Sequence, residues 1–375
     1  MIRFWVRGTG TLLVLAVLLS ACAPAASPAP TPAVPMSAPT KAPQAANPSP
    51  VTTTAPAATP TPKPATLVFG NNQTLSNAGI FVAIDKGYFQ EQGITLKVEN
   101  FQSADQLIAP LGTGQLDVSS NAVSVALLAA ADRGIEMRAV AGLNQYRPKW
   151  ESGWVMLRKD LADSGQLKTP ADLKGMKVAV SSKGGLGDQV VQTMIEQAKL
   201  KPEDVDVVVL PLAEQVAAFG NKAIAASWAT EPYIVQGVQQ GFSVKWIPTS
   251  QFFGGNAQGL FVIFGASLLK DQDLARRWMV AYLKGARDYL KAFTTKEGRD
   301  DVIKTLVKYT TLKDPKLYDV MEMPYIDPDG MPDKNSVDAE FKWLVGKGLY
   351  AGKKTFADMT DLSSVDYAVQ KLGKP

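Results

Sequence analysis

The sequence of 375 residues contains no histidine and only one cysteine, Cys22. Without histidine there can be no Ser-His-Asp or Cys-His nucleophile, no imidazole acid or base near neutral pH, and no histidine-ligated metal. A single cysteine excludes an intramolecular disulfide and every Cys-x-x-Cys metal or redox motif. These absences remove the common hydrolase and zinc chemistries, and we expect neither a metal nor a cofactor.

Most of the chain also lacks an excess of either positive or negative charge. The formal net charge is +4, and residues 1–66 supply all of it, because they hold Arg3, Arg7, Lys41 and Lys63 and no acidic residue. The rest of the chain has equal numbers of basic and acidic residues. Proteins that bind nucleic acid neutralise phosphates with basic side chains. We therefore expect no nucleic-acid partner.

The first residues have the pattern of a secretory signal. Two arginines precede an apolar run over residues 11–19, which ends at Leu19-Ser20-Ala21-Cys22. A membrane-spanning helix needs about 20 apolar residues, so a signal peptide over residues 1–21 is favoured over a transmembrane helix. The last four of these residues resemble a bacterial lipobox, which would make Cys22 the acylated first residue of the mature chain. A plain signal peptide is the alternative.

A segment rich in proline follows the cysteine. Residues 23–66 hold 13 of the 25 prolines together with many alanines, serines and threonines. This composition cannot form a packed core, and proline-rich chain extends by about 3.1 Å per residue. We predict that residues 22–66 are a lipidated cysteine and a disordered linker. They would hold a globular domain outside the cytoplasm, anchored by lipid to the cell membrane in the periplasm or on the outer face.

From Thr66 onward, short apolar runs alternate with amphipathic ones. The runs predict strands over 67–69, 94–98, 116–118, 137–141, 154–157, 177–180, 205–210, 223–227 and 260–264. The amphipathic stretches predict helices over 78–84, 104–111, 121–131, 188–198, 213–219, 274–293, 300–309, 337–345 and 363–372. This alternation is typical of mostly parallel α/β sheets with helices on both faces.

The order of these elements predicts two α/β lobes and a hinged cleft. We assign residues 67–157 to the first part of lobe I, 158–250 to lobe II, and 251–375 to the return to lobe I and a helical C-terminal tail. Ligands of open α/β sheets bind outside the carboxyl ends of the strands, where helix N-termini offer free N–H groups. We therefore expect the ligand in the loops that follow the strands.

Four stretches resemble a known family in the same order. They are AGIFVAIDKGYFQEQG at 78–93, GQLDV and ALLAAADRGIEMRAVAG within 107–142, KTPADLKGMKVAVS at 168–181, and AEQVAAFGNKAIAASWATEPYI at 213–234. Together they are similar to substrate-binding proteins of ABC importers that take nitrate, sulfonates, taurine or bicarbonate, and to relatives that bind thiamine-precursor pyrimidines or riboflavin. The resemblance implies a fold like periplasmic-binding-protein type II. It also implies a monomeric, non-enzymatic solute-binding component that delivers a small-molecule ligand to permease and ATPase subunits.

The resemblance also implies which residues lie at or near the ligand: Ser76, Asn77, Asn121, Gly184, Gly185, Leu186, Trp228 and Glu231. Asn72 in an amide-rich loop, and Trp154 and Phe253 near the expected lobe crossings, are further candidates.

These candidates have structural alternatives. Ser76 and Asn121 could cap helices, and the glycines could form a tight turn. Trp228 could belong to the core between the lobes, and Glu231 could face a helix dipole.

The nature of the ligand and the class of function stay open at this point. Amide-rich loops and Trp228 suit a heteroaromatic solute such as a pyrimidine or flavin, whereas helix N-termini suit an oxyanion. A ligand-binding sensor lipoprotein without an importer is one rival. A serine hydrolase is the other, because Ser267-Leu268-Leu269-Lys270 matches the Ser-x-x-Lys motif of penicillin-recognising enzymes. The accompanying Ser-Asp-Asn and Lys-Thr-Gly motifs are absent from the sequence.

Overall fold

The computed structural model describes residues 62–352 and 354–375. They belong to one compact unit, Thr59–Pro375. The predicted signal peptide, Cys22 and nearly all of the predicted linker lie outside the described residues. Within the described part, no helix combines the length and the apolar character needed to cross a membrane.

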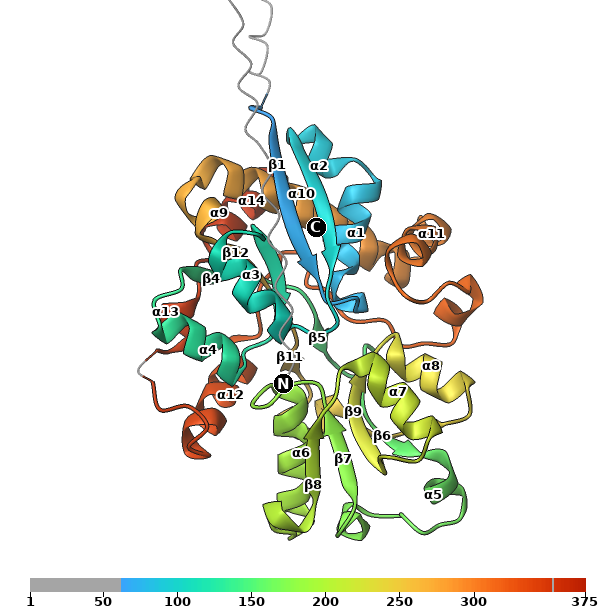
Figure 1. Cartoon of the computed structure of the whole chain (residues 1–375). Coiled ribbons are helices and arrows are strands. Elements are labelled where there is room, and N and C mark those ends of the chain that lie inside the picture. The colour runs from blue at the N-terminus through green and yellow to red at the C-terminus, as the bar shows by residue number, and fades with distance from the viewer. Residues whose placement is uncertain (1–61, 353) are drawn as a thin grey trace, which may run out of the picture. The chain divides into compact units, whose positions relative to one another are not determined.

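The first sheet has five strands in the order β2-β1-β3-β12-β4 (Figure 1). Their bounds are β1 Ala65–Asn71, β2 Ile94–Asn100, β3 Val118–Asn121, β4 Met137–Gly142 and β12 Phe261–Gly265. Strand β1 pairs in parallel with β2 and β3, whereas β12 runs antiparallel to β3 and β4. The chain reaches β12 only after it has built the second sheet.

The second sheet also has five strands, in the order β10-β6-β9-β7-β8. Their bounds are β6 Gly153–Arg158, β7 Lys177–Val180, β8 Asp206–Val209, β9 Ala226–Thr230 and β10 Ser243–Pro248. Strand β7 is parallel to β8 and β9, whereas β6 is antiparallel to β9 and β10. Each sheet is therefore mostly parallel, as predicted, and is made mixed by one strand, the strand that follows the crossing, which runs against its neighbours.

The crossings between the sheets carry a small sheet of their own. Strands β5 (Gln145–Tyr146) and β11 (Ala257–Gln258) pair antiparallel. Strand β6 already belongs to the second sheet, so the lobe boundary that we placed between residues 157 and 158 falls inside a strand. The first crossing lies in residues 143–152.

Helices surround both sheets and follow the predicted stretches closely. The longer helices are α1 Ala78–Asp85, α3 Ile108–Thr113, α4 Val125–Asp132, α6 Leu186–Gln197, α7 Leu212–Gly220, α8 Tyr233–Gln239, α10 Gln272–Thr294, α11 Arg299–Tyr309, α12 Lys334–Gly346 and α14 Ser363–Leu372. The shorter ones are α2 Tyr88–Glu91, α5 Lys159–Asp163, α9 Ala266–Lys270 and α13 Phe356–Met359, with 3-10 turns η1 Leu75–Asn77, η2 Asp105–Leu107, η3 Pro170–Leu173, η4 Pro202–Asp204, η5 Thr249–Phe253 and η6 Pro315–Asp319.

Two elements differ from the prediction in ways that concern the site. Helix α4 begins at Val125, not at Asn121, and its N-cap is Ser124, whose Oγ accepts a hydrogen bond from the Leu127 amide at 3.2 Å. The strand predicted over 223–227 lies at 226–230, which places Trp228 inside β9. Both differences arise because short alanine-rich and serine-rich runs carry little periodicity.

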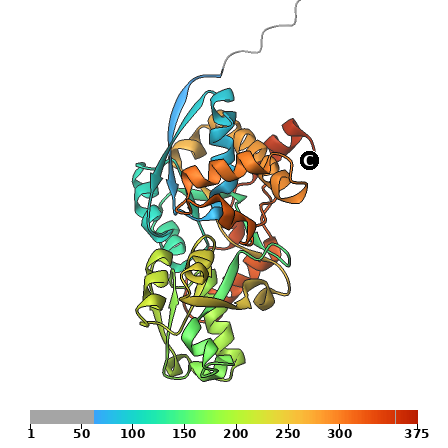
Figure 2. The same ribbon diagram turned by 90° about the vertical axis from the view of Figure 1, so that its right-hand side faces the viewer.

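The first sheet packs against the pair of helices α1 and α10, which lie side by side (Figures 1 and 2). Helix α10 buries Trp278, Tyr282 and Tyr289 on its inner face. At Gly285 it approaches α1 so closely that an added Cβ would lie 2.2 Å from the Gly79 carbonyl oxygen. Only glycine permits this approach, because the obstacle is backbone.

We expect Gly285→Ala to lower the free energy of unfolding by about 1–3 kcal/mol, because the new methyl forces two packed helices apart. Thermal unfolding measures the change. Gly346→Ala is the matched control, since an added Cβ at that helical position meets nothing within 4 Å. Equal melting temperatures for the two variants would contradict the predicted close approach.

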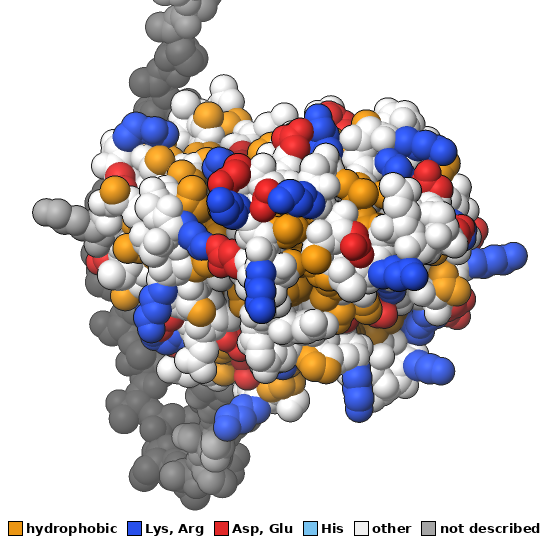
Figure 3. All heavy atoms as spheres, turned by 90° about the horizontal axis from the view of Figure 1, so that it is seen from below, with side chains coloured by type: hydrophobic (Ala, Val, Ile, Leu, Met, Phe, Trp, Pro, Cys, Tyr) orange, Lys and Arg blue, Asp and Glu red, His pale blue; other side chains and the backbone are white. Residues whose placement is uncertain are grey.

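Basic and acidic side chains are interspersed on the face of the molecule shown in Figure 3. Ion pairs at the surface also join opposite charges: Lys174 and Asp204 lie 3.2 Å apart, as do Lys177 and Asp206. Such exposed pairs contribute little to stability. Their effect is that charges of opposite sign neutralise each other locally.

Candidate ligand-binding site

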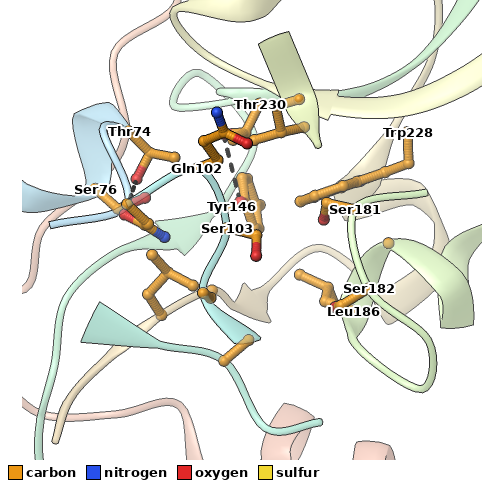
Figure 4. Close-up of a pocket in the computed structure, with 17 residues that line it drawn as sticks. Thr74, Ser76, Gln102, Ser103, Tyr146, Ser181, Ser182, Leu186, Trp228 and Thr230 are labelled. Carbon is orange, nitrogen blue, oxygen red and sulfur yellow. Dashed lines mark hydrogen bonds between the residues drawn. The ribbon is translucent and has the colours of Figure 1, made fainter. Parts of the chain in front are cut away.

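A cavity lies beside the carboxyl ends of strands from both sheets (Figure 4). Its empty space, counted together with the open solvent at its mouth, is about 640 Å³. Its polar wall consists of Asn72, Thr74, Ser76, Gln102, Ser103, Ser181, Ser182 and Thr230. The rest of the wall consists of Tyr146, Trp228, Ala104, Ala122, Leu186, Leu212, Leu260, Gly187 and Gly259.

The wall carries no formal charge. None of the described residues that line the cavity is a lysine, arginine, aspartate or glutamate. A charged ligand would therefore meet hydroxyls, amides and backbone dipoles instead of an opposite charge.

Two helix starts, and the turns that lead into two further helices, border this cavity. Leu186 and Gly187 are the first residues of α6, and Leu212 is the first residue of α7. Ser76 lies in the turn that leads into α1, and Ala104 precedes the turn that leads into α3. The first N–H groups of a helix have no intrahelical partner, and the helix dipole adds partial positive charge there. The arrangement can therefore hold an anion or a carbonyl oxygen.

The loop after β1 is held in place by amide side chains. The Asn72 Oδ1 atom accepts hydrogen bonds from Thr74 Oγ1 at 3.1 Å, from Asn77 Nδ2 at 3.0 Å and from Ser120 Oγ at 3.3 Å. Asn77 Nδ2 also donates to Asn71 Oδ1 at 2.8 Å. Asn77 is fully buried behind the wall. Its role in this structure is to order the loop that carries Asn72, Thr74 and Ser76.

Two aromatic side chains form one part of the wall. Trp228 Nε1 donates to Thr249 Oγ1 at 2.8 Å, and the indole meets the Tyr146 ring edge to face with centroids 6.0 Å apart. The Tyr146 hydroxyl lies 3.5 Å from Thr230 Oγ1. Burial raises the pKa of Tyr146 to about 12, so its hydroxyl stays protonated at neutral pH. We call Trp228 and Tyr146 together the aromatic wall.

The structure brings four of the proposed ligand residues onto the cavity wall: Asn72, Ser76, Leu186 and Trp228. The helix-cap alternative for Ser76 is wrong, because no side-chain capping hydrogen bond forms at η1 or α1. Trp228 also belongs to the hydrophobic core of the second sheet. The core that it joins is that of the second sheet and not one between the lobes, and its contact with a ligand stays a prediction.

Asn121 supports the wall from behind. It ends β3, its Nδ2 donates to the Ala104 carbonyl at 2.6 Å, and its Oδ1 accepts from Ser119 Oγ at 2.6 Å. Its side chain is buried and does not line the cavity. The expected cap role is also wrong, since α4 starts four residues later.

Gly184 and Gly185 lie next to the cavity without lining it. Gly184 has a φ of 67°, and a Cβ there would lie 2.3 Å from Val125 Cγ2 of α4 and 3.2 Å from Leu344 Cδ2 of α12. This glycine thus permits contact between the α6 loop and the helices of the first sheet. Gly185 is the N-cap of α6.

Trp154, Glu231 and Phe253 do not line the cavity. Trp154 Nε1 donates to the Glu151 carbonyl at 2.9 Å and to Glu322 Oε2 at 3.2 Å. Glu231 is buried at the start of α8, where its Oε2 accepts from the Val235 amide at 3.0 Å. Phe253 packs against the core of the second sheet. All three serve the packing around the crossings.

Sequence reasoning missed four polar residues of the wall: Gln102, Ser103, Ser181 and Ser182. All four lie in the loops that follow the carboxyl ends of β2 and β7. The rule that selected the loop after β1 would also have selected these loops, because the carboxyl ends of parallel strands share one edge of a sheet.

Comparison with known proteins gives the family. The model of the family described as NMT1/THI5 like matches residues 75–292. A protein of Brucella abortus named as a binding protein is 24% identical over 213 residues, which cover 56% of this chain and 62% of that protein. A protein of Escherichia coli K12 named as an aliphatic sulfonates-binding protein is 33% identical over 143 residues, 38% of this chain and 41% of that protein. The chain thus matches less than two thirds of the length of these relatives.

Solved structures share the fold at low sequence identity. The periplasmic nitrate-binding protein of Synechocystis PCC 6803 superposes with a TM-score of 0.68 at 16% identity, over 84% of this chain and 90% of that one. The desulfurization enzyme DszB superposes with a TM-score of 0.57 at 13% identity, over 82% and 99%. The expected periplasmic-binding-protein type II fold is confirmed, and the chain belongs to the NMT1/THI5-like family.

Proposed function

We propose that this protein is the extracytoplasmic solute-binding component of an ABC importer and that its solute is an organic oxyanion of the sulfonate type. One observation carries the proposal. Two helix starts, two turns that lead into helices and a set of hydroxyls converge from both sheets on a cavity whose described lining has no charged side chain. Neutral dipoles of this kind stabilise an anion without an ion pair.

The aromatic wall supports an organic solute over a bare ion. Trp228 and Tyr146 offer apolar surface to a carbon chain or ring, while the hydroxyls of Ser76 and Ser182 offer donors to oxygen atoms. An aliphatic sulfonate has both an apolar chain and an anionic oxygen group, and this protein is similar to one named as an aliphatic sulfonates-binding protein.

The expected mechanism is closure around the solute. The polar wall contains Asn72, Thr74 and Ser76 from the loop after a strand of the first sheet. It also contains Ser181 and Ser182 from the loop after a strand of the second sheet. A solute that contacts both groups stabilises the closed arrangement over the open one. The permease would then recognise the closed form.

Titration calorimetry with matched solutes tests the proposal. We expect 1-butanesulfonate to bind and its neutral analogue butane-1-sulfonamide to bind at least tenfold more weakly, because only the anion gains from the helix dipoles. At 100 times its dissociation constant the sulfonate would stabilise the fold by about 2.7 kcal/mol. Equal affinity for the two compounds, or binding only to riboflavin or a pyrimidine in the same panel, would overturn the oxyanion assignment.

The rival serine hydrolase gains no support from the geometry. Ser267 Oγ donates to Asp117 Oδ1 at 2.6 Å, and Lys270 Nζ lies 3.4 Å from Glu136 Oε2. Both members of the motif are therefore occupied by carboxylates at the surface of the first sheet. We propose that the protein is not an enzyme, although DszB shares its fold. Labelling of Ser267 by a penicillin-type acylating probe would contradict this.

The lipid anchor on Cys22 and the permease and ATPase partners complete the proposal. The lipobox-like sequence and the proline-rich segment support an anchored protein. We expect Cys22→Ser to move the protein from the membrane fraction to the soluble fraction of the cell. Unchanged membrane association in that variant would count against the anchor.

A further inference from the structure

We propose that Gly187 determines the size of the organic group that the cavity accepts, by fixing the indole of Trp228. Gly187 is the second residue of α6, and both residues line the cavity. The inference rests on the proposed function, because it concerns the same site. It assigns a role to a residue that packs against the indole of Trp228 and lines the same cavity.

The indole lies directly on the backbone of the first turn of α6. A Cβ added at Gly187 would lie 2.5 Å from Trp228 Cε3, 2.8 Å from Cδ2 and 3.2 Å from Cγ. These distances are far below ordinary van der Waals contact, and the atoms belong to a rigid ring close to its backbone attachment. The helical backbone conformation of Gly187 is one that any residue can adopt. Glycine is therefore required here by the close approach of the ring and not by the backbone dihedral angles.

The other contacts of the indole leave it little freedom. Trp228 Nε1 is held by Thr249 Oγ1 at 2.8 Å, and Thr249 is fully buried in η5. The Tyr146 ring stands edge to face against the indole. Tyr146 depends on a second glycine, because a Cβ at Gly153 would lie 2.6 Å from its Cε1 atom and 2.9 Å from Thr249 Oγ1. Two glycines and one threonine thus fix the whole aromatic wall.

We expect a displaced indole to move toward the cavity, because Trp228 lines it. The backbone of Trp228 is fixed in β9, which pairs with β6 on one side and β7 on the other. A methyl group at position 187 would push the ring by about 1 Å to reach normal contact. Figure 4 shows Thr74 and Ser76 on the opposite side of the cavity from Trp228. The distance available to a chain or ring between these two sides would shrink.

Gly187→Ala tests the inference with a series of sulfonates. We expect the dissociation constants of 1-butanesulfonate and benzenesulfonate to rise at least tenfold, and that of methanesulfonate to change less than threefold. The melting temperature of Gly187→Ala, compared with that of the original protein, will show whether the fold is intact. Alanine by itself favours a helix over glycine, so helix propensity alone should not lower it. Gly346→Ala is the control, because its added methyl meets open space. The double variant Gly187→Ala/Trp228→Ala should bind butanesulfonate as well as Trp228→Ala alone does, because the added methyl meets no ring once the indole is gone.

A readout without ligand separates the inference from the proposed function. The indole N–H resonance of Trp228, identified by its loss in Trp228→Phe, should shift in Gly187→Ala and stay unchanged in Gly346→Ala. Sulfonate binding with the same preference for chain length in Gly187→Ala as in the original protein would overturn the inference alone, as would an unshifted resonance. Absence of any sulfonate binding by the original protein would overturn the proposed function and the inference with it.

Discussion

Ser182→Asp is expected to weaken the binding of an anionic solute by about 100-fold. Ser182 lines the cavity just before the start of α6. A carboxylate about 5 Å from a bound oxyanion costs about 3 kcal/mol at an effective dielectric constant of 20. The same carboxylate near a helix N-terminus favours the folded state, so the loss of affinity should come without a loss of stability. Calorimetry and thermal unfolding of the same sample measure the two quantities.

Ser182→Asn is the matched control for this substitution. The amide has nearly the size of the carboxylate and carries no charge, so it reports the steric part of the effect alone. We expect Ser182→Asn to change the affinity for 1-butanesulfonate much less than Ser182→Asp does. Similar affinities for the two variants would show that the solute brings no negative charge to this part of the wall.

The stability of the protein is expected to fall as the pH rises from about 4.5 to about 7. Burial raises the pKa of Glu231 to about 7 in the folded state, against 4.5 for an ordinary glutamate. Burial raises the pKa of Glu151 to about 7 as well. Above an unfolded pKa of 4.5 the unfolded chain releases these protons and the folded chain retains them, so the folded state loses stability until the folded pKa is passed.

Glu231→Gln should remove the Glu231 part of this pH dependence. A shift of this size corresponds to about 3 kcal/mol, so the variant should be more stable than the original protein at pH 8 by up to that amount and nearly equal to it at pH 4. The glutamine oxygen can still accept the hydrogen bond that the Val235 amide donates to Glu231. Chemical denaturation at both pH values gives the comparison.

Exposed Glu203 provides the control for the pH experiment. Glu203→Gln should leave the stability difference between pH 4 and pH 8 unchanged. If Glu231→Gln behaves in the same way, the Glu231 carboxyl does not take up a proton on folding. Another interaction must then offset the cost of burying its negative charge.

Periodicity and motif order in the sequence determined the elements and the family. The amphipathic stretch over 274–293 became α10 at 272–294 because a long helix repeats its apolar positions many times. The strand at 177–180 was predicted at its exact bounds because a short apolar run ends there at a serine and glycine loop. Prediction missed the strand β10 at 243–248 altogether, and it misplaced the elements at residues 121–131 and 223–227, where alanine and serine carry no clear pattern.

The tertiary structure alone decided which of the candidate residues share a cavity. Ser76 and Trp228 face one space only because strands from two sheets end beside it, whereas Glu231, three residues beyond Trp228, is buried at the start of α8. The spacing of residues in the sequence cannot predict which of them face a common cavity. The direction of a side chain depends on strand pairing and on where the chain crosses between the sheets. Gly187 is a second example, because nothing in the sequence indicates why this position must be glycine. The reason appears only in the structure, where the Trp228 indole packs against its backbone.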